Sequence, residues 1–225
     1  MHELLSVVAE TFEKNGVKYW ASDGTLFAAF RNQPPGIFKW DDDLDLSVFF
    51  DDAQRVEAAL SKEKRLDWIR ETKDWDGWRV GLVSYSNELH EKQRPMDIFG
   101  LRKVACQEEG PAHWNHYSTA QSRCRFDNCF FEDSDIVETR PCQFWDLTIQ
   151  CPVGAKNFLR HCYGPNAFRT ARVRSHSERT SVNYLIDLDT ENLNDHGAFV
   201  PGLDKALANR LLRNSNFEKY PEPTN

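Results

Sequence analysis

Residues 20–31 read Trp20-Ala-Ser-Asp-Gly-Thr-Leu-Phe-Ala-Ala-Phe-Arg31, and after a Pro-Pro-Gly turn residues 40–50 read Trp40-Asp-Asp-Asp-Leu-Asp-Leu-Ser-Val-Phe-Phe50. In the first half, Gly24-Thr25 follows a short apolar run and opens a second apolar run with helical character. This order predicts a strand, a tight turn and the start of a helix. Backbone N–H groups exposed at such a turn favour a phosphate, so the turn is a candidate anion-binding site.

The second half places aspartates directly before an apolar strand. Side chains two residues apart on a strand share a face, so Asp43 and Asp45 are expected to point the same way, with Leu44 and Leu46 turned into the core. Two adjacent carboxylates repel each other unless a cation neutralises them. Hard oxygen ligands select Mg²⁺ or Mn²⁺. The pattern predicts a divalent metal site at Asp43 and Asp45, with a solvated acidic loop as the alternative.

A third acidic residue lies within the apolar stretch Pro95-Met-Asp-Ile-Phe-Gly100. An aspartate inside an apolar strand is unfavourable unless something pairs with it. We interpret Asp97 as a third metal-binding carboxylate. The alternative is a strand-end aspartate that caps a turn.

The composition narrows the class of protein. The chain has 225 residues, 40% of them hydrophobic, and a formal net charge of −7. An acidic chain is a poor candidate for nucleic-acid binding, which depends on phosphate neutralisation by Lys and Arg. No segment approaches the roughly 20 apolar residues of a membrane span. The N-terminus lacks the basic and apolar regions of a signal peptide, so we expect a cytoplasmic protein.

The cysteines show no strong metal motif. No Cys-x-x-Cys pair occurs, and Cys124-x4-Cys129 is the nearest approach to a metal spacing. In the cytoplasm most of them are expected to be buried thiols, with a zinc site as the alternative. The six cysteines are Cys106, Cys124, Cys129, Cys142, Cys151 and Cys162.

The remaining pattern places the other elements. It predicts helices at residues 2–15, 53–64 and 203–213, a hairpin of strands at 67–72 and 78–84, one strand at 144–151, and a helix from Pro152 to Gly164. Residues 214–225 are expected to form a flexible tail.

Residues 19–46 resemble the signature of a known family. Tyr-Trp-x-x-x-Gly-Thr-Leu-x-x-x-x-Arg, followed by Trp-Asp-Asp-Asp-Leu-Asp-Leu, is similar to the pattern of the LicD family. That family includes bacterial phosphocholine transferases, is related to fukutin and fukutin-related protein, and belongs to the nucleotidyltransferase superfamily of DNA polymerase beta. The resemblance implies an α/β (α+β) core with a small mixed sheet flanked by helices. It would occupy residues 1–165, with residues 166–213 as an extension packed on the core.

The resemblance also implies an activity. It implies transfer of a phospho-alcohol, such as phosphocholine or a polyol phosphate, from a CDP-activated donor to a hydroxyl of a glycan or other acceptor, with Mg²⁺ or Mn²⁺ as cofactor. By resemblance, the metal-binding and catalytic residues are Asp43, Asp45 and Asp97, and the donor-binding residues are Gly24, Thr25, Arg31 and Lys39. Asp97 is also a candidate general base for the acceptor hydroxyl, and a structural ion pair with the acidic cluster is an alternative role for Arg31.

The chain departs from the family pattern at three positions. Asp23 stands where a glycine is usual, Ala28 where a glycine is usual, and Lys39 where a proline is usual. Asp23 adds negative charge beside the phosphate site, and Lys39 would offset it. These changes leave two alternatives open: a transferase that moves NMP from an NTP to a small molecule or protein, and a non-catalytic nucleotide-binding module on the same fold.

Overall fold

The computed structural model covers the predicted core. It describes residues 1–32, 34–37, 41, 43–72, 75–86, 94–104, 113–115, 131–163, 168, 170–173, 184–187 and 218–219. All predicted site residues fall within these ranges except Lys39, which lies outside them.

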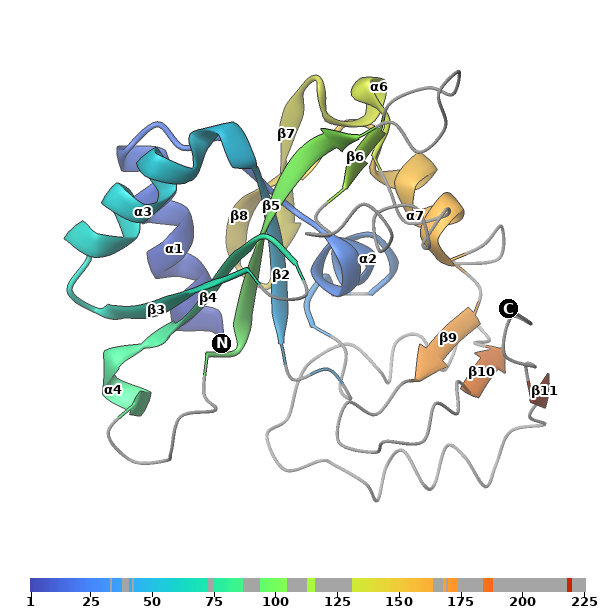
Figure 1. Ribbon diagram of the computed structural model, residues 1–225. Helices are drawn as coiled ribbons and strands as arrows, with labels where there is room; N and C mark the ends of the chain where they lie inside the picture. Colours follow the sequence, from blue (N-terminus) through green and yellow to red (C-terminus); the bar gives the residue numbers. More distant parts are fainter. Residues whose placement is uncertain are drawn as a thin grey trace.

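A mixed sheet forms the centre of the molecule (Figure 1). The two middle strands, β2 and β5, run parallel, and every other pairing in the sheet is antiparallel. The predicted small mixed sheet and the predicted hairpin are confirmed. In spatial order the strands are β1 (Tyr19–Ala21), β2 (Leu44–Phe49), β5 (Met96–Val104), β4 (Gly77–Leu82) and β3 (Leu66–Glu71), with β6 (His113–Asn115) paired to the far end of β5.

Helices flank the sheet on both faces (Figure 1). On one side lie α1 (His2–Lys14) and α3 (Ala53–Lys62), and on the other lie α2 (Asp23–Arg31) and α7 (Ala155–Tyr163). The helices α1 and α3 each bury an apolar stripe at helical spacing, as expected for a helix packed on a sheet.

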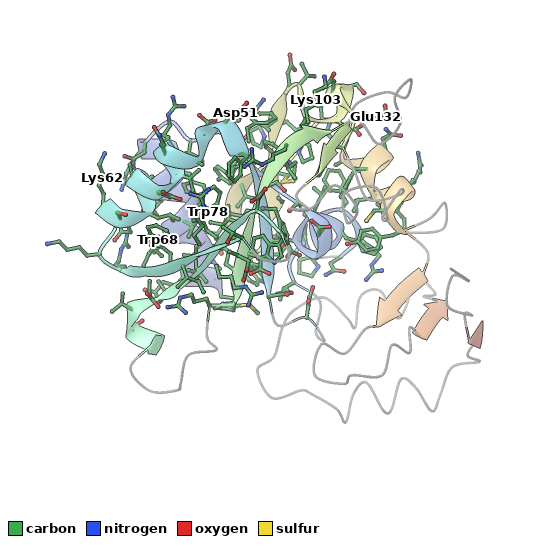
Figure 2. The ribbon with its side chains drawn as sticks, viewed as in Figure 1. Asp51, Lys62, Trp68, Trp78, Lys103 and Glu132 are labelled. Carbon is green, nitrogen blue, oxygen red and sulfur yellow. A yellow bond between two sulfur atoms is a disulfide. The ribbon has the colours of Figure 1, made fainter. Side chains whose placement is uncertain are left out.

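The face toward α1 and α3 carries part of the apolar core. One row across the sheet consists of Leu46, Ile98 and Trp78, each with no exposed surface, followed by Arg70 at the edge. The Trp78 indole N–H donates to Glu57 of α3, 3.2 Å away, which shows that this row faces that helix (Figure 2). Since side chains alternate along a strand, the residues next to this row must project to the opposite face.

The other elements are short. In the described part of the chain they are η1 (Phe50–Asp52), α4 (Val83–Ser86), α6 (Asp133–Ile136) and a separate small sheet of β9 (Thr170–Val173), β10 (Tyr184–Asp187) and β11 (Glu218–Lys219). No helix in these ranges is both long and apolar enough to cross a bilayer. The predicted helix at 203–213 lies outside the described residues, and the domain boundaries stay a prediction.

Residues 139–152 correct one sequence prediction. The single strand expected at 144–151 is wrong, because the segment is a hairpin of β7 (Thr139–Phe144) and β8 (Leu147–Pro152). Trp145 takes a positive φ of 55° in the two-residue turn, and its backbone N–H donates to the carbonyl of Pro35, 2.8 Å away. This conformation is uncommon for a bulky residue, so the sequence carried no turn signal there.

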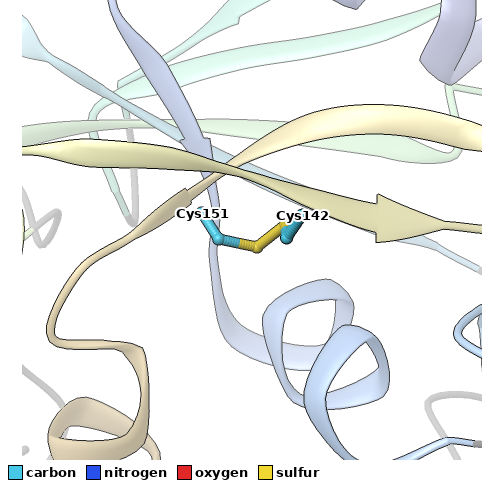
Figure 3. The surroundings of a disulfide bond; sticks show 2 residues. All are labelled: Cys142 and Cys151. Atoms are coloured by element: carbon cyan, nitrogen blue, oxygen red, sulfur yellow. A yellow bond between two sulfur atoms is a disulfide. The ribbon is translucent and has the colours of Figure 1, made fainter.

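The cysteines also correct a prediction. Cys142 and Cys151 form a disulfide across this hairpin, with Cα atoms 5.8 Å apart, and Cys162 is disulfide-bonded as well (Figure 3). The prediction of buried thiols is therefore wrong for these three, whereas Cys106, Cys124 and Cys129 lie outside the described residues. Disulfides persist in oxidising compartments and are rare in the cytoplasm. The bonded cysteines thus weigh against the cytoplasmic location, which stays a prediction.

Removing the hairpin disulfide should lower stability. The bond closes a short loop, and the chain-entropy model assigns such a crosslink about 2.5 kcal/mol of unfolding free energy. The double variant Cys142→Ala/Cys151→Ala should lose about this amount in urea unfolding. An unchanged unfolding midpoint would show that β7–β8 pairing and packing alone hold the hairpin.

Candidate active site

Asp45 lies at the centre of the candidate site, and the turn between β1 and α2 fixes it at three points. The Ser22 backbone N–H donates to the Asp45 carbonyl (3.1 Å), and the Asp45 backbone N–H donates to the Thr25 hydroxyl oxygen (2.8 Å). The Gly24 backbone N–H donates to the Asp45 carboxylate (2.9 Å). Thr25 is only 1% exposed. In this structure Gly24 and Thr25 therefore hold Asp45, and their contact with a donor phosphate stays a prediction.

Gly24 is required by the close approach of two carboxylates. A Cβ atom at this position would lie 2.9 Å from Asp41 Oδ2 and 3.1 Å from Asp45 Oδ2. Only a residue without a side chain lets both carboxylates come this close to the start of α2. The turn therefore brings Asp41, which had no assigned role, to the same place as Asp45.

Asp97 lies directly beside Asp45. The two residues are register partners on the parallel strands β2 and β5. Neighbouring strands lie about 4.8 Å apart, and paired residues project to the same face. The sheet thus brings together two acidic residues that are far apart in the sequence, and Asp43 reaches the same cluster from the residue before β2.

The cluster is electrostatically unfavourable without a cation. Asp45 is 8% exposed, and its burial raises the pKa of its carboxyl well above the ordinary value, with further increases from the charges of Asp43, Asp23, Asp41 and Asp97 in that order. Burial also raises the pKa of Asp23 to about 6, opposed by a hydrogen bond from Ser22 and increased by the charge of Asp43. Both pKa shifts have the same physical causes, which are burial of the carboxyl group and the negative charge of neighbouring aspartates.

Asp23 itself was not expected in the cluster. It is the first residue of α2 and has a positive φ of 42°. Aspartate tolerates this left-handed conformation better than most residues. Its presence where the family usually has glycine is therefore compatible with the turn, and it adds an acid to the site.

The donor set fits a hard divalent cation. Within the described ranges no three acidic, histidine or cysteine side chains are already gathered closely enough to hold a metal ion. The strand register nevertheless pairs Asp45 with Asp97, and the charges of Asp43, Asp23 and Asp41 also act on Asp45. All the candidate ligands are carboxylate oxygens, the type that Mg²⁺ and Mn²⁺ prefer. The metal site at Asp43, Asp45 and Asp97 stays a prediction that this chemistry supports.

Arg31 lies at the C-terminal end of α2 and is buried. It occupies the last turn of α2, roughly 10 Å along the helix axis from Gly24. It is 5% exposed, its guanidinium stacks 4.2 Å over the Phe27 ring, and burial lowers its pKa to about 9 while Tyr163 opposes this change. These contacts place the Arg31 guanidinium against Phe27 and near Tyr163, and its roles in donor binding and in an ion pair with the cluster both stay predictions.

Arg79 lies beside the acidic cluster, which the sequence did not predict. In β4 it is the register partner of Asp97, and its Nε atom lies 3.7 Å from Asp97 Oδ1. The alternation in residues 78–82 placed Arg79 on the face opposite Trp78, but only the strand register shows that this face carries the acids.

Residues 16–153 match the family described as LicD/FKTN/FKRP, nucleotidyltransferase domain. The chain belongs to this family. The match spans the elements that build the site, from β1 to the end of the β7–β8 hairpin, and members of the LicD/FKTN/FKRP family are generally transferases.

Two curated relatives are similar over part of their length. An uncharacterized protein of Rickettsia prowazekii is 25% identical over 153 residues, which is 68% of this chain and 49% of the relative. An uncharacterized protein of Rickettsia typhi is 35% identical over 68 residues, which is 30% of this chain and 21% of that protein. The chain thus spans about half or less of the length of these relatives.

Proposed function

We propose that the protein is a divalent-metal-dependent phosphotransferase that moves a phospho-alcohol from a CDP-activated donor to a hydroxyl group of a glycan or other acceptor. The supporting observation is the pairing of Asp45 with Asp97 on the central parallel strands, directly in front of the turn that begins α2. Carboxylates concentrated in this way suit a reaction in which phosphate charge must be held by cations.

The residues of the chain have distinct roles in this proposal. Asp43, Asp45 and Asp97 would hold Mg²⁺ or Mn²⁺. The bound ion would neutralise charge on the transferring phosphoryl group and its leaving group. The contacts of Ser22, Gly24 and Thr25 fix the backbone and carboxylate of Asp45 before substrate binds, so this ligand needs little reorganisation.

Asp97 is also the proposed general base. Its side chain is 23% exposed, which leaves it open to an acceptor hydroxyl at the edge of the cluster. The hydroxyl proton would pass to the Asp97 carboxylate as the oxygen attacks the donor phosphorus, and CMP would leave.

A second candidate function is NMP transfer from an NTP, because it needs the same metals and the same acids. The two reactions release different products. A phospho-alcohol transferase releases CMP from a CDP-alcohol, whereas a nucleotidyltransferase releases pyrophosphate from an NTP.

The test is a product assay on the purified chain. With Mg²⁺ and a mixture of hydroxyl acceptors, labelled CDP-choline or CDP-ribitol should yield CMP, and EDTA should stop the release. Pyrophosphate from labelled NTPs with no CMP from any CDP-alcohol would instead establish the second function. If neither product forms although CDP binds with Mg²⁺ present, the chain is a non-catalytic nucleotide-binding module. If CDP does not bind either, the proposed transferase function is wrong.

A further inference from the structure

The pairing of β4 with β5 fixes the position of Arg79 beside the acidic cluster. One row across the strands consists of Asp45 on β2, Asp97 on β5, Arg79 on β4 and Ile69 on β3. The row lies on the face opposite Trp78. Arg79 therefore stands on the same surface as the acidic cluster, with Asp97 between it and Asp45.

The contacts of Arg79 are long and its side chain is partly exposed. Its Nε atom lies 3.7 Å from Asp97 Oδ1, and its Nη2 atom lies 3.8 Å from Glu71 Oε2. Charge-assisted hydrogen bonds of arginine are about 2.7–2.9 Å long, so both contacts are ion pairs without a direct hydrogen bond. The side chain is 45% exposed, and its guanidinium lies 5.8 Å from the Trp75 ring.

This geometry differs from that of a structural arginine. Arg70, on the opposite face of the same sheet, has its Nη1 atom 2.7 Å from Glu57 Oε1 and is engaged in a short hydrogen bond. Arg79 has a carboxylate on either side and reaches neither at that distance. It is held near the site by charge, and its planar donors remain able to bind another anion.

We propose that Arg79 is a substrate-binding residue that exchanges partners. In the metal-free protein it offsets the charge of Asp97. When divalent cations occupy the acidic cluster, Asp97 is neutralised by the metal, and Arg79 turns to the diphosphate of the activated donor. This inference rests on the proposed function, since it needs a donor with a diphosphate at the acidic cluster.

The exchange predicts two effects of opposite sign in Arg79→Gln. Without the competing positive charge, the cluster should bind Mn²⁺ alone about two- to fivefold more tightly, the range expected for a partly exposed ion pair. The same variant should bind CDP in saturating Mn²⁺ at least about tenfold more weakly, because a charge-assisted contact to phosphate is lost. A purely structural role would not tighten metal binding while weakening diphosphate binding.

Two further variants sharpen the test. Arg79→Lys keeps the charge without the planar fork, so it should bind Mn²⁺ like the wild type and CDP with intermediate affinity. Arg70→Gln is the matched control, because Arg70 is an arginine of similar exposure (39%) on the other face, and it should change neither affinity.

Isothermal titration with Mn²⁺ alone, and with CDP or inorganic pyrophosphate in saturating Mn²⁺, measures these affinities. Thermal melts of each variant verify folding. Wild-type affinity for CDP in Arg79→Gln, with the wild type binding normally, would overturn the assignment of Arg79 and leave the proposed function intact. A wild-type protein that binds Mn²⁺ but neither CDP nor pyrophosphate would overturn both.

Discussion

Replacing Asp45 by asparagine should reduce turnover at least about 10³-fold and, in the absence of metal, make the protein more stable at neutral pH. The first effect follows because a metal-held phosphoryl transition state depends on carboxylate ligands for several kcal/mol, and 1.36 kcal/mol corresponds to a factor of ten. The second effect follows because Asp45 is buried among four other aspartates. In the proposed function, Asp45 would therefore be a metal ligand whose burial opposes folding of the metal-free protein.

The pH dependence gives the sign of the stability effect. The pKa of Asp45 is raised in the folded protein, so the folded state binds its proton more tightly than the unfolded state does. The contribution of Asp45 to the free energy of unfolding is therefore largest below the ordinary aspartate pKa. It is lost as the pH rises through the pKa that Asp45 has in the folded protein. Asp23, with a pKa of about 6, contributes in the same direction between pH 4 and 6. Asparagine at position 45 removes the first contribution.

Thermal melts of metal-free wild type and Asp45→Asn at pH 4 and pH 7.5 measure this effect. The melting temperature of the variant should exceed that of the wild type at pH 7.5, and the gap should close at pH 4. Adding Mg²⁺ should stabilise the wild type at pH 7.5 more than the variant. Asp51→Asn is the control, since Asp51 is exposed in η1 and should show neither effect. Turnover close to wild type in Asp45→Asn would contradict the metal role.

The sequence was sufficient for the elements that depend on local pattern. The two apolar leucines that flank Asp45 are fully buried, as the alternation predicted. The helices α1 and α3 and the hairpin of β3 and β4 appear within a few residues of the expected bounds. Each of these depends on a periodicity that a short segment contains by itself.

What the sequence could not provide was register. The pairing of Asp97 with both Asp45 and Arg79 depends on how β5 sits between β2 and β4, and no local signal reports that alignment. The role of Arg79 therefore could not be predicted from the sequence of β4 alone. The contact of Gly24 could not be predicted for the same reason. Its backbone N–H donates to the Asp45 carboxylate, which only the folded sheet brings to the turn.

Gly77→Ala should be strongly destabilising and tests the contact that aligns these strands. A Cβ atom at position 77 would lie 2.1 Å from the backbone carbonyl oxygen of Ile98 and 2.5 Å from the Trp75 ring. A backbone oxygen on a central strand cannot move aside as a flexible side chain would. We expect a loss of about 3 kcal/mol or more in unfolding free energy, the upper range for overpacking a well-filled interior.

Gly16→Ala provides the matched comparison. Gly16 has a φ of +63° and no heavy atom within 4 Å of a built Cβ, so its loss should be limited to the backbone strain of about 1 kcal/mol. Urea unfolding of both variants compares backbone strain alone at Gly16 with crowding at Gly77, where a φ of +159° adds strain as well. Since β4 carries Arg79 two residues beyond Gly77, any Gly77→Ala protein that folds should also bind CDP more weakly. Equal losses in the two variants would show that β4 and β5 can separate at Gly77 without disturbing the sheet, and that the alignment of Arg79 with Asp97 does not depend on this contact.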